Sequence, residues 1–239
     1  MSNQIDPIPA LGLLIAFIPA VVVFAIMWRW ATGVQTALYA TLRMLLQLLL
    51  IGYVLVYIFD SEQPLVIALV LVIMLVAASW IAMRPLDSKS SSTYLRTLFA
   101  IGVGGVLTLA LVTQFVLSVQ PWFSPRHVVP LAGMIFAGCM NTVSLAAERM
   151  QAELQKGNGF EKARNSAFTA AMIPIVNSLF AVGLVTLPGM MTGQILSGVS
   201  PLIAAKYQIV VMAMLFGASG IAAALYLHGL SPKRAGLEP

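Results

Sequence analysis

Charged residues are scarce in this sequence. Only 9% of its 239 residues are charged, whereas 60% are hydrophobic, and the mean hydropathy is +0.95. A soluble globular domain has about 25% charged residues, so the composition excludes an ordinary soluble protein. It is typical of a polytopic membrane protein, because each span needs about 20 mostly apolar residues whose backbone amides are paired within one helix.

Residues and motifs that act in catalysis or bind metals and nucleotides are also rare. The single cysteine, Cys139, excludes an internal disulfide and any multi-cysteine metal site. The sequence has two histidines and contains no Gly-x-x-x-x-Gly-Lys-Ser/Thr loop, no His-Glu-x-x-His and no Gly-x-Ser-x-Gly. We therefore expect no catalytic residue, no cofactor and no enzyme activity in this chain, and the pattern identifies no metal ligands.

The gaps between charges predict an all-α bundle of about seven transmembrane helices in one domain, 1–239. The predicted spans are 7–28, 36–59, 63–83, 97–125, 127–147, one crossing within 165–205, and 207–232. The stretch 165–205 could instead hold two short spans, and the sequence leaves open whether 188–205 re-enters the membrane.

Basic residues orient the bundle, because Lys and Arg stay on the cytoplasmic side. With the N-terminus outside and the C-terminus cytoplasmic, ten of the 13 Lys and Arg residues are cytoplasmic. They are Arg29, Arg84, Lys89, Arg96, Arg149, Lys156, Lys162, Arg164, Lys233 and Arg234. This distribution favours one crossing in 165–205, and we expect a multi-pass protein of the plasma (bacterial inner) membrane. The net charge of +5 then reflects topology and attraction to anionic lipid, and not nucleic-acid binding.

One hydrophilic segment interrupts the apolar sequence at 147–168. Seven charged residues lie between Glu148 and Arg164, but none lies in 127–147 or 165–205. Apolar residues at helical spacing flank Gly157-Asn158-Gly159, which predicts a helix, a tight turn and a second helix lying along the membrane face. The pairs Glu153–Lys156 and Glu161–Arg164 have i,i+3 spacing. The segment is either a solvated connector or a surface to which a cytoplasmic partner binds.

A few polar residues and a methionine pair lie within or beside the predicted spans. Arg43 and Gln47 share one helix face, where Arg43 either extends its head group to the membrane surface or has an interior role. Asn141 and Ser144 also share a face and either hydrogen-bond neighbouring helices or line a path. Met190 and Met191, in the glycine-rich external segment 188–198, could act as soft ligands or as packing residues.

Several motifs together resemble the FetB-type ABC permeases, a family described as iron exporters with plant relatives linked to aluminium tolerance. They are Arg43-Met-Leu-Leu-Gln47 through Gly52, Gly133-Met-Ile, Asn141-Thr-Val-Ser144-Leu through Glu148-Arg149, Pro174-x-x-Asn177-Ser178, Leu187-Pro-Gly-Met-Met-Thr-Gly-Gln-Ile-Leu-Ser-Gly198 and Tyr207-Gln-Ile-Val-Val-Met212. The resemblance implies a permease that pairs with a separate cytosolic ATP-binding subunit and with a second copy of itself.

The resemblance also gives the hydrophilic segment a role. Such permeases dock a short coupling helix, often Glu-Ala-Ala-x-x-x-Gly, into their ATPase, and Gln151-Ala-Glu153-x-x-x-Gly157 is similar but has Gln in the first position. The residues implied in coupling are Glu148, Arg149, Glu153, Gly157, Glu161 and Arg164. Those implied in a translocation path are Arg43, Gln47, Asn141, Ser144, Met190 and Met191.

Two other functional classes compete with this interpretation. A secondary transporter or channel usually buries several acidic groups for ion coupling, but every acid here is predicted in a loop or at the end of a span. A purely structural scaffold predicts no ATPase partner. The resemblance implies a metal, and iron in particular, as substrate, whereas the residues themselves leave a metal chelate or a small organic compound open.

Overall fold

The computed structural model describes residues 8–60, 63–87 and 89–230, and within these ranges it contains helices and no strand. The predicted all-α, polytopic helical fold is confirmed. The chain forms two compact units, Met1–Asp60 and Ser61–Pro239, which are described separately. Lys233 and Arg234, used above to orient the chain, lie outside the described residues.

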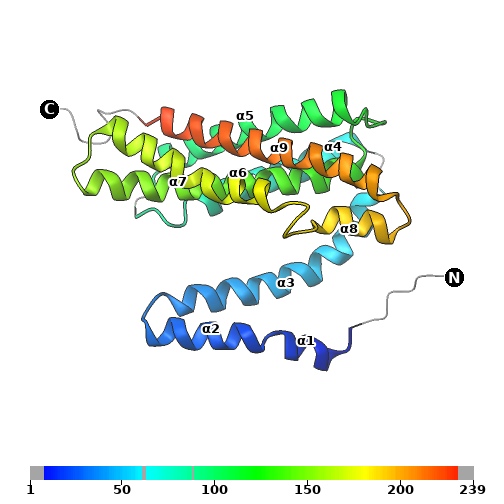
Figure 1. The fold of residues 1–239 in the computed structure, drawn as a ribbon, viewed down its shortest axis with the longest axis horizontal. Coiled ribbons are helices and arrows are strands. Elements are labelled where there is room, and N and C mark those ends of the chain that lie inside the picture. Colours follow the sequence, from blue (N-terminus) through cyan, green and yellow to red (C-terminus); the bar gives the residue numbers. More distant parts are fainter. Residues whose placement is uncertain (1–7, 61–62, 88, 231–239) are drawn as a thin grey trace. The chain divides into compact units, whose positions relative to one another are not determined.

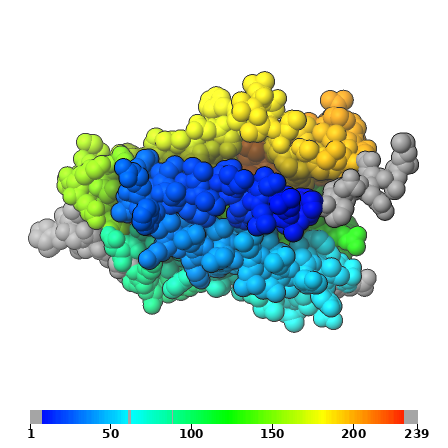
Figure 2. All heavy atoms as spheres, turned by 90° about the horizontal axis from the view of Figure 1, so that it is seen from below, coloured from blue at the N-terminus to red at the C-terminus, as the bar shows by residue number. Residues whose placement is uncertain are grey.

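The first unit contains α1 (Ala10–Ala16), α2 (Ile18–Arg29) and α3 (Val34–Phe59) (Figure 1). Pro19 separates α1 from α2, because it has no N–H to continue the first helix. Gly33, with φ 77°, starts α3 after a tight turn. No residue of α1 or α2 is buried, and most of the large apolar side chains of these helices, which lie in the blue part of Figure 2, are exposed.

The second unit contains the remaining helices. They are α4 (Pro64–Ala82), α5 (Ser91–Ala110), the π-helical turn η1 (Leu111–Val116), α6 (Pro125–Gln155), α7 (Phe160–Ala181), α8 (Gly189–Leu196) and α9 (Pro201–His228). Helix α6 packs against α4, α5, α7 and α9, while α8 packs against α9. The core therefore lies along α6 and α9. Residues 180–187 lie at the surface (yellow in Figure 2), and Leu184 is 91% exposed.

Six helical segments of the described residues are long and apolar enough to cross a membrane: Ala10–Arg29, Val34–Phe59, Pro64–Ala82, Ser91–Val116, Pro125–Gln155 and Pro201–His228. Helix α7 falls outside this group because charged residues occupy its first turns. Its 22 residues nevertheless extend about 33 Å at 1.5 Å per residue, and it packs along α6 and α9. The stretch 165–205 thus holds the rest of one long helix, the short α8 and the first residues of α9.

Several predicted span boundaries were wrong, and where the helix is longer than predicted the difference has one physical reason. The span predicted at 97–125 begins at Ser91 and its helix ends at Val116, and the span predicted at 127–147 continues to Gln155. Helices extend beyond the apolar layer into water, where charged residues are tolerated, so a gap between charges marks the hydrocarbon layer and not the ends of the helix.

Small residues bring α5 and α9 into close contact. A methyl group added at Gly104 would lie 2.9 Å from the Ala222 backbone nitrogen and 3.0 Å from the Ala218 carbonyl oxygen. Ala218 and Ala222 are themselves fully buried. Without a hydrophobic driving force between helices in lipid, such contact supplies much of the association energy.

We predict that Gly104→Ala destabilises the bundle by about 1–3 kcal/mol, because the new methyl group meets backbone atoms that cannot move aside. Gly217→Ala in α9 is the matched control, since no atom lies within 4 Å of the added methyl group. Thermal unfolding in detergent, followed by tryptophan fluorescence, should show a lower melting temperature for Gly104→Ala only. Equal melting temperatures for the two variants would contradict this packing argument.

Candidate functional site

The hydrophilic segment 147–168, here called the elbow, is the junction of two long helices. Its first half is the continuous end of α6 and its second half is the start of α7. The expectation of a separate helix pair lying along the membrane face was therefore wrong. The 31 residues of α6 extend about 46 Å, which exceeds the roughly 30 Å hydrocarbon layer, so one helix crosses the membrane and also forms the elbow.

Gly157 closes α6 with a Schellman motif. The Gly157 N–H donates to the Leu154 carbonyl at 2.9 Å, and the Asn158 N–H donates to the Glu153 carbonyl at 3.2 Å. Both bonds require a left-handed residue after the helix, and Gly157 has φ 79°. The turn predicted from Gly157-Asn158-Gly159 is thus present, and it leaves no flexible linker between α6 and α7.

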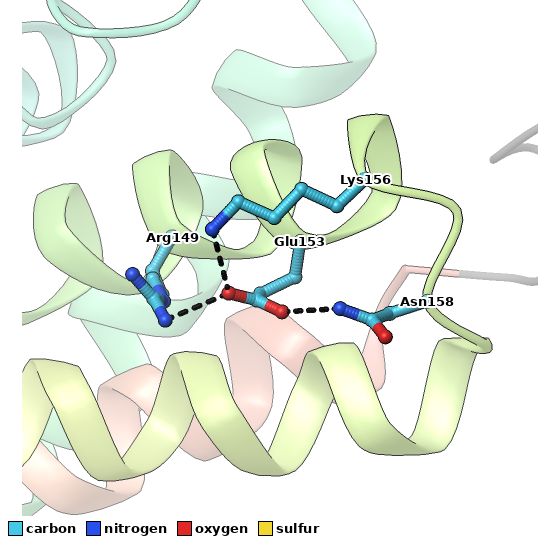
Figure 3. A network of polar contacts seen from close by, with 4 residues as sticks. All are labelled: Arg149, Glu153, Lys156 and Asn158. Atoms are coloured by element: carbon cyan, nitrogen blue, oxygen red, sulfur yellow. Dashed lines mark hydrogen bonds and ion pairs between the residues drawn. The ribbon is translucent and has the colours of Figure 1, made fainter.

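The Glu153 carboxylate joins the end of α6 to this turn (Figure 3). Its Oε1 lies 2.7 Å from Arg149 Nη2 and 3.5 Å from Lys156 Nζ, and its Oε2 accepts a 2.6 Å hydrogen bond from Asn158 Nδ2. The Glu153 side chain is only 7% exposed. Desolvation acts to raise the pKa of Glu153, but the two cations and the Asn158 amide outweigh it and lower the pKa, so the carboxylate stays ionised at neutral pH.

A hydrogen bond between residues far apart in the sequence joins the elbow to the loop between α4 and α5. Gln151 Nε2 donates to the Asp87 carboxylate. The same loop leads into α5, whose first turn is capped where Ser90 Oγ accepts from the Thr93 N–H at 3.2 Å. The end of α6, the turn and the α4–α5 loop thus form one connected polar surface.

The structure brings only some of the predicted coupling residues together. Arg149, Glu153 and Gly157 build the turn, while Glu148 and Glu161 are exposed and Arg164 is half-buried. In the described part of the chain the predicted Glu161–Arg164 pair does not form, whereas Glu153–Lys156 does. Sequence analysis missed the Arg149–Glu153 pair, although its i,i+4 spacing was visible, and it missed the amide role of Asn158, which had been considered only for its backbone.

The predicted path residues are divided between the two units. In the first unit, the Gln47 side-chain oxygen, with the amide oriented to satisfy its neighbour, accepts from Arg43 Nε at 3.1 Å and from Nη2 at 3.3 Å. In the second unit, Asn141 is exposed and Ser144 is half-buried on α6. Met190 and Met191 lie on α8. Their role in transport stays a prediction.

Metal-binding and acidic coupling sites were also sought. The described residues contain no group of three or more His, Cys, Asp or Glu side chains that could hold a metal ion. The described acids of the second unit lie in the α4–α5 loop, the last turns of α6 and the first turn of α7. Within these ranges, no acid is available inside the bundle for ion coupling.

We predict that Gly157→Pro breaks the elbow, because proline fixes φ near about −65° and removes the N–H that caps α6. The matched control is Gly159→Pro, since Gly159 already has φ −61°. Limited proteolysis in detergent should cleave 154–160 faster in Gly157→Pro than in the wild type or in Gly159→Pro. Gly157→Ala should cost about 1–2 kcal/mol, from the left-handed conformation alone. Identical cleavage in both proline variants would contradict the role of this turn.

Comparison with known proteins places these features in a family. Residues 10–233 match the uncharacterised protein family UPF0014. The UPF0014 membrane protein slr1647 of Synechocystis is 34% identical over 77% of both chains. The "probable iron export permease protein FetB" of Escherichia coli is 34% identical over 75% of this chain and 73% of its own, and the protein ALUMINUM SENSITIVE 3 of Arabidopsis thaliana is 32% identical over 77% and 71%. No solved structure matches. With one family covering nearly the whole bundle and the elbow, this chain belongs to the UPF0014 family of membrane proteins.

Proposed function

We propose that this chain is the membrane-spanning permease subunit of an ABC transporter, that it exports iron or another metal, and that a separate cytosolic ATPase powers it. The observation that carries the proposal is the elbow, a turn between two long helices of the bundle that is held by ion pairs around the buried Glu153 carboxylate. A relative whose name describes an iron export permease supports the transport role. ATP itself would bind to the partner, since this sequence has no phosphate-binding loop.

The mechanism follows from the continuity of the helices. Because the capped turn replaces a flexible linker, a displacement of the elbow is passed directly to α6 and α7. Both helices pack against α9, so the displacement also changes the packing of the core. ATP-driven movement of a partner bound at the elbow would in this way switch the bundle between inward and outward openings.

The partner would meet a surface of mixed charge. Glu148, Glu161 and Lys162 are exposed on the elbow, and Asp87 and Lys89 are exposed on the adjoining loop. The Nε atom of Arg149 is buried and has no acceptor among the described residues. A carboxylate or carbonyl of the ATPase, inserted beside Arg149, would complete this donor.

The proposed orientation places the elbow in the cytoplasm of a bacterial inner membrane, with the N-terminus outside. The basic residues Arg29 at the end of α2, Arg84 after α4 and Arg96 in α5 then lie on the same side as the elbow. We further propose that two copies work together. The face of α6 that carries exposed Asn141 and half-buried Ser144 would line a path with the second copy, together with Arg43, Gln47, Met190 and Met191.

Co-purification tests the energy source. The tagged chain, extracted in mild detergent, should retain a nucleotide-binding subunit in a fixed stoichiometry. Glu153→Gln removes the charge that holds Arg149 and Lys156, so we expect at least a tenfold loss of the bound subunit, while Gly159→Pro should retain it. A wild-type chain that purifies without any nucleotide-binding protein would show that the permease assignment is wrong.

Cellular metal content tests the substrate. A strain lacking this chain should accumulate more iron than the same strain complemented with the chain and its ATPase. The Gly157→Pro variant should fail to complement although it is present in the membrane, which an immunoblot would check. Equal iron in the deletion and complemented strains, with another metal or compound elevated in the deletion, would move the substrate away from iron.

A further inference from the structure

One face of α7 carries polar side chains that have no partner within the described protein. Thr169 and Asn177 are exposed and Ser166 is half-buried, and none of these side chains makes a hydrogen bond with another described residue. Ile173, which is 52% exposed, completes a set that recurs every three or four residues and therefore shares one side of the helix. We call these four residues the polar face of α7.

A different side of α7 holds the helix in the bundle. Ala163, Ala167 and Ala171, four residues apart, are almost completely buried, and α7 packs against α6 and α9. Their small side chains allow the helices to approach closely. The polar face lies outside this buried stripe, so the packing of α7 on the core does not cover it.

The polar face extends deep into the membrane. No charged residue follows Arg164 until Lys206, so the water-facing part of α7 ends near Arg164. At about 1.5 Å per residue, Thr169 then lies about 8 Å and Asn177 about 20 Å further along the helix. Both distances fall within a hydrocarbon layer of about 30 Å. Lipid at this depth offers no hydrogen-bond partner to either side chain.

Hydroxyl groups elsewhere in the second unit are satisfied differently. Thr97, Thr108 and Thr142 each donate to the carbonyl one turn earlier in their own helix, at 2.9, 2.7 and 3.0 Å. This local bond is available to any threonine in a helix. Thr169 does not make it, although its hydroxyl would gain most from it if its surroundings were lipid. The free hydroxyl indicates water beside this face.

Pro174 leaves a backbone acceptor on the same stretch of helix. Proline has no N–H, so Pro174, inside α7, cannot donate to the Ala170 carbonyl four residues earlier. Pro174 is exposed and Ala170 is half-buried. Such gaps are tolerated within a membrane where water or a neighbouring group completes them. The carbonyl and the unpaired side chains therefore have the same requirement.

We propose that the polar face of α7 lines a water-filled path across the membrane, along which a solute passes within its own water shell. Hydroxyl and amide groups both donate and accept hydrogen bonds, so they bind the water around a solute and discriminate little by its charge. The role of this path in transport rests on the proposed permease function. The inference adds Ser166, Thr169 and Asn177 to the residues of the path.

Cysteine labelling tests the path without any partner. Thr169→Cys, Ile173→Cys and Asn177→Cys are made singly in the full chain, placed in lipid nanodiscs and treated with a charged methanethiosulfonate reagent. All three should be modified about ten times faster than cysteines at Phe168 and Leu179, because a thiol reacts as the thiolate, which forms where water reaches it. Ile173→Cys is the most informative variant, since an apolar residue labels only if its surroundings contain water.

Matched controls come from the same helix. Phe168 and Leu179 are 37% and 38% exposed, and they lie at nearly the depths of Thr169 and Asn177 but on another side of α7. Cys139 of the wild type is 0% exposed and should stay unmodified, so it needs no replacement. All five variants should melt as the wild type does, because none of the replaced residues is buried.

Equal labelling rates at the five positions, or no labelling of the polar face, would overturn the path, because lipid or a packed helix would then cover this side of α7. The result is independent of the ATPase experiment. If a nucleotide-binding subunit co-purifies but the polar face does not label, the path along α7 is wrong and the permease assignment stands. If the face labels and no ATPase associates, the path stands and the source of energy is wrong.

Discussion

The absence of hydrogen-bond partners in hydrocarbon is the constraint on which this structure depends. Each backbone amide in the membrane must be paired inside its own helix, which leaves helices as the elements of the described chain. Because lipid is as apolar as leucine, the helices cannot associate by hiding apolar surface from water. The helices associate instead through close van der Waals contact between their backbones. Alanine and glycine therefore occupy the α5–α9 interface, although larger residues would bury more apolar surface there.

Charge is confined to the places where water can reach it. The elbow places a carboxylate between two cations and an amide donor, an arrangement that lets the charge be buried without losing its partners. The bundle core uses hydroxyl groups differently. Ser79, Thr97, Thr108, Thr113 and Thr142 all bond to a carbonyl one turn earlier in their own helix. The Gln194 and Gln208 side-chain oxygens are exceptions, because they have no hydrogen-bond partner among the described residues.

Much of the fold could be predicted from sequence, because long apolar runs and the placement of Lys and Arg reflect the membrane directly. The ends of α5 and α6 could not, since charged residues such as Arg96 and Glu148 lie within helices that continue into water. Gly157 was identifiable as a turn residue from its neighbours. The hydrogen bond between Asp87 and Gln151 could not be predicted, because no periodicity connects residues so far apart in the chain. The unpaired oxygens of Gln194 and Gln208 can be recognised only once the surroundings of these side chains are known.

The length of α6 sets how far the elbow stands from the membrane. Arg126 and His127 at its first turn keep that end at the lipid boundary, so the excess of roughly 16 Å over the hydrocarbon layer extends on the other side. That distance carries the turn beyond the head groups into bulk water. A partner bound at the elbow, as proposed, would contact the chain at a distance from the bilayer, so that the strength of its binding would not depend on which phospholipids the cell makes.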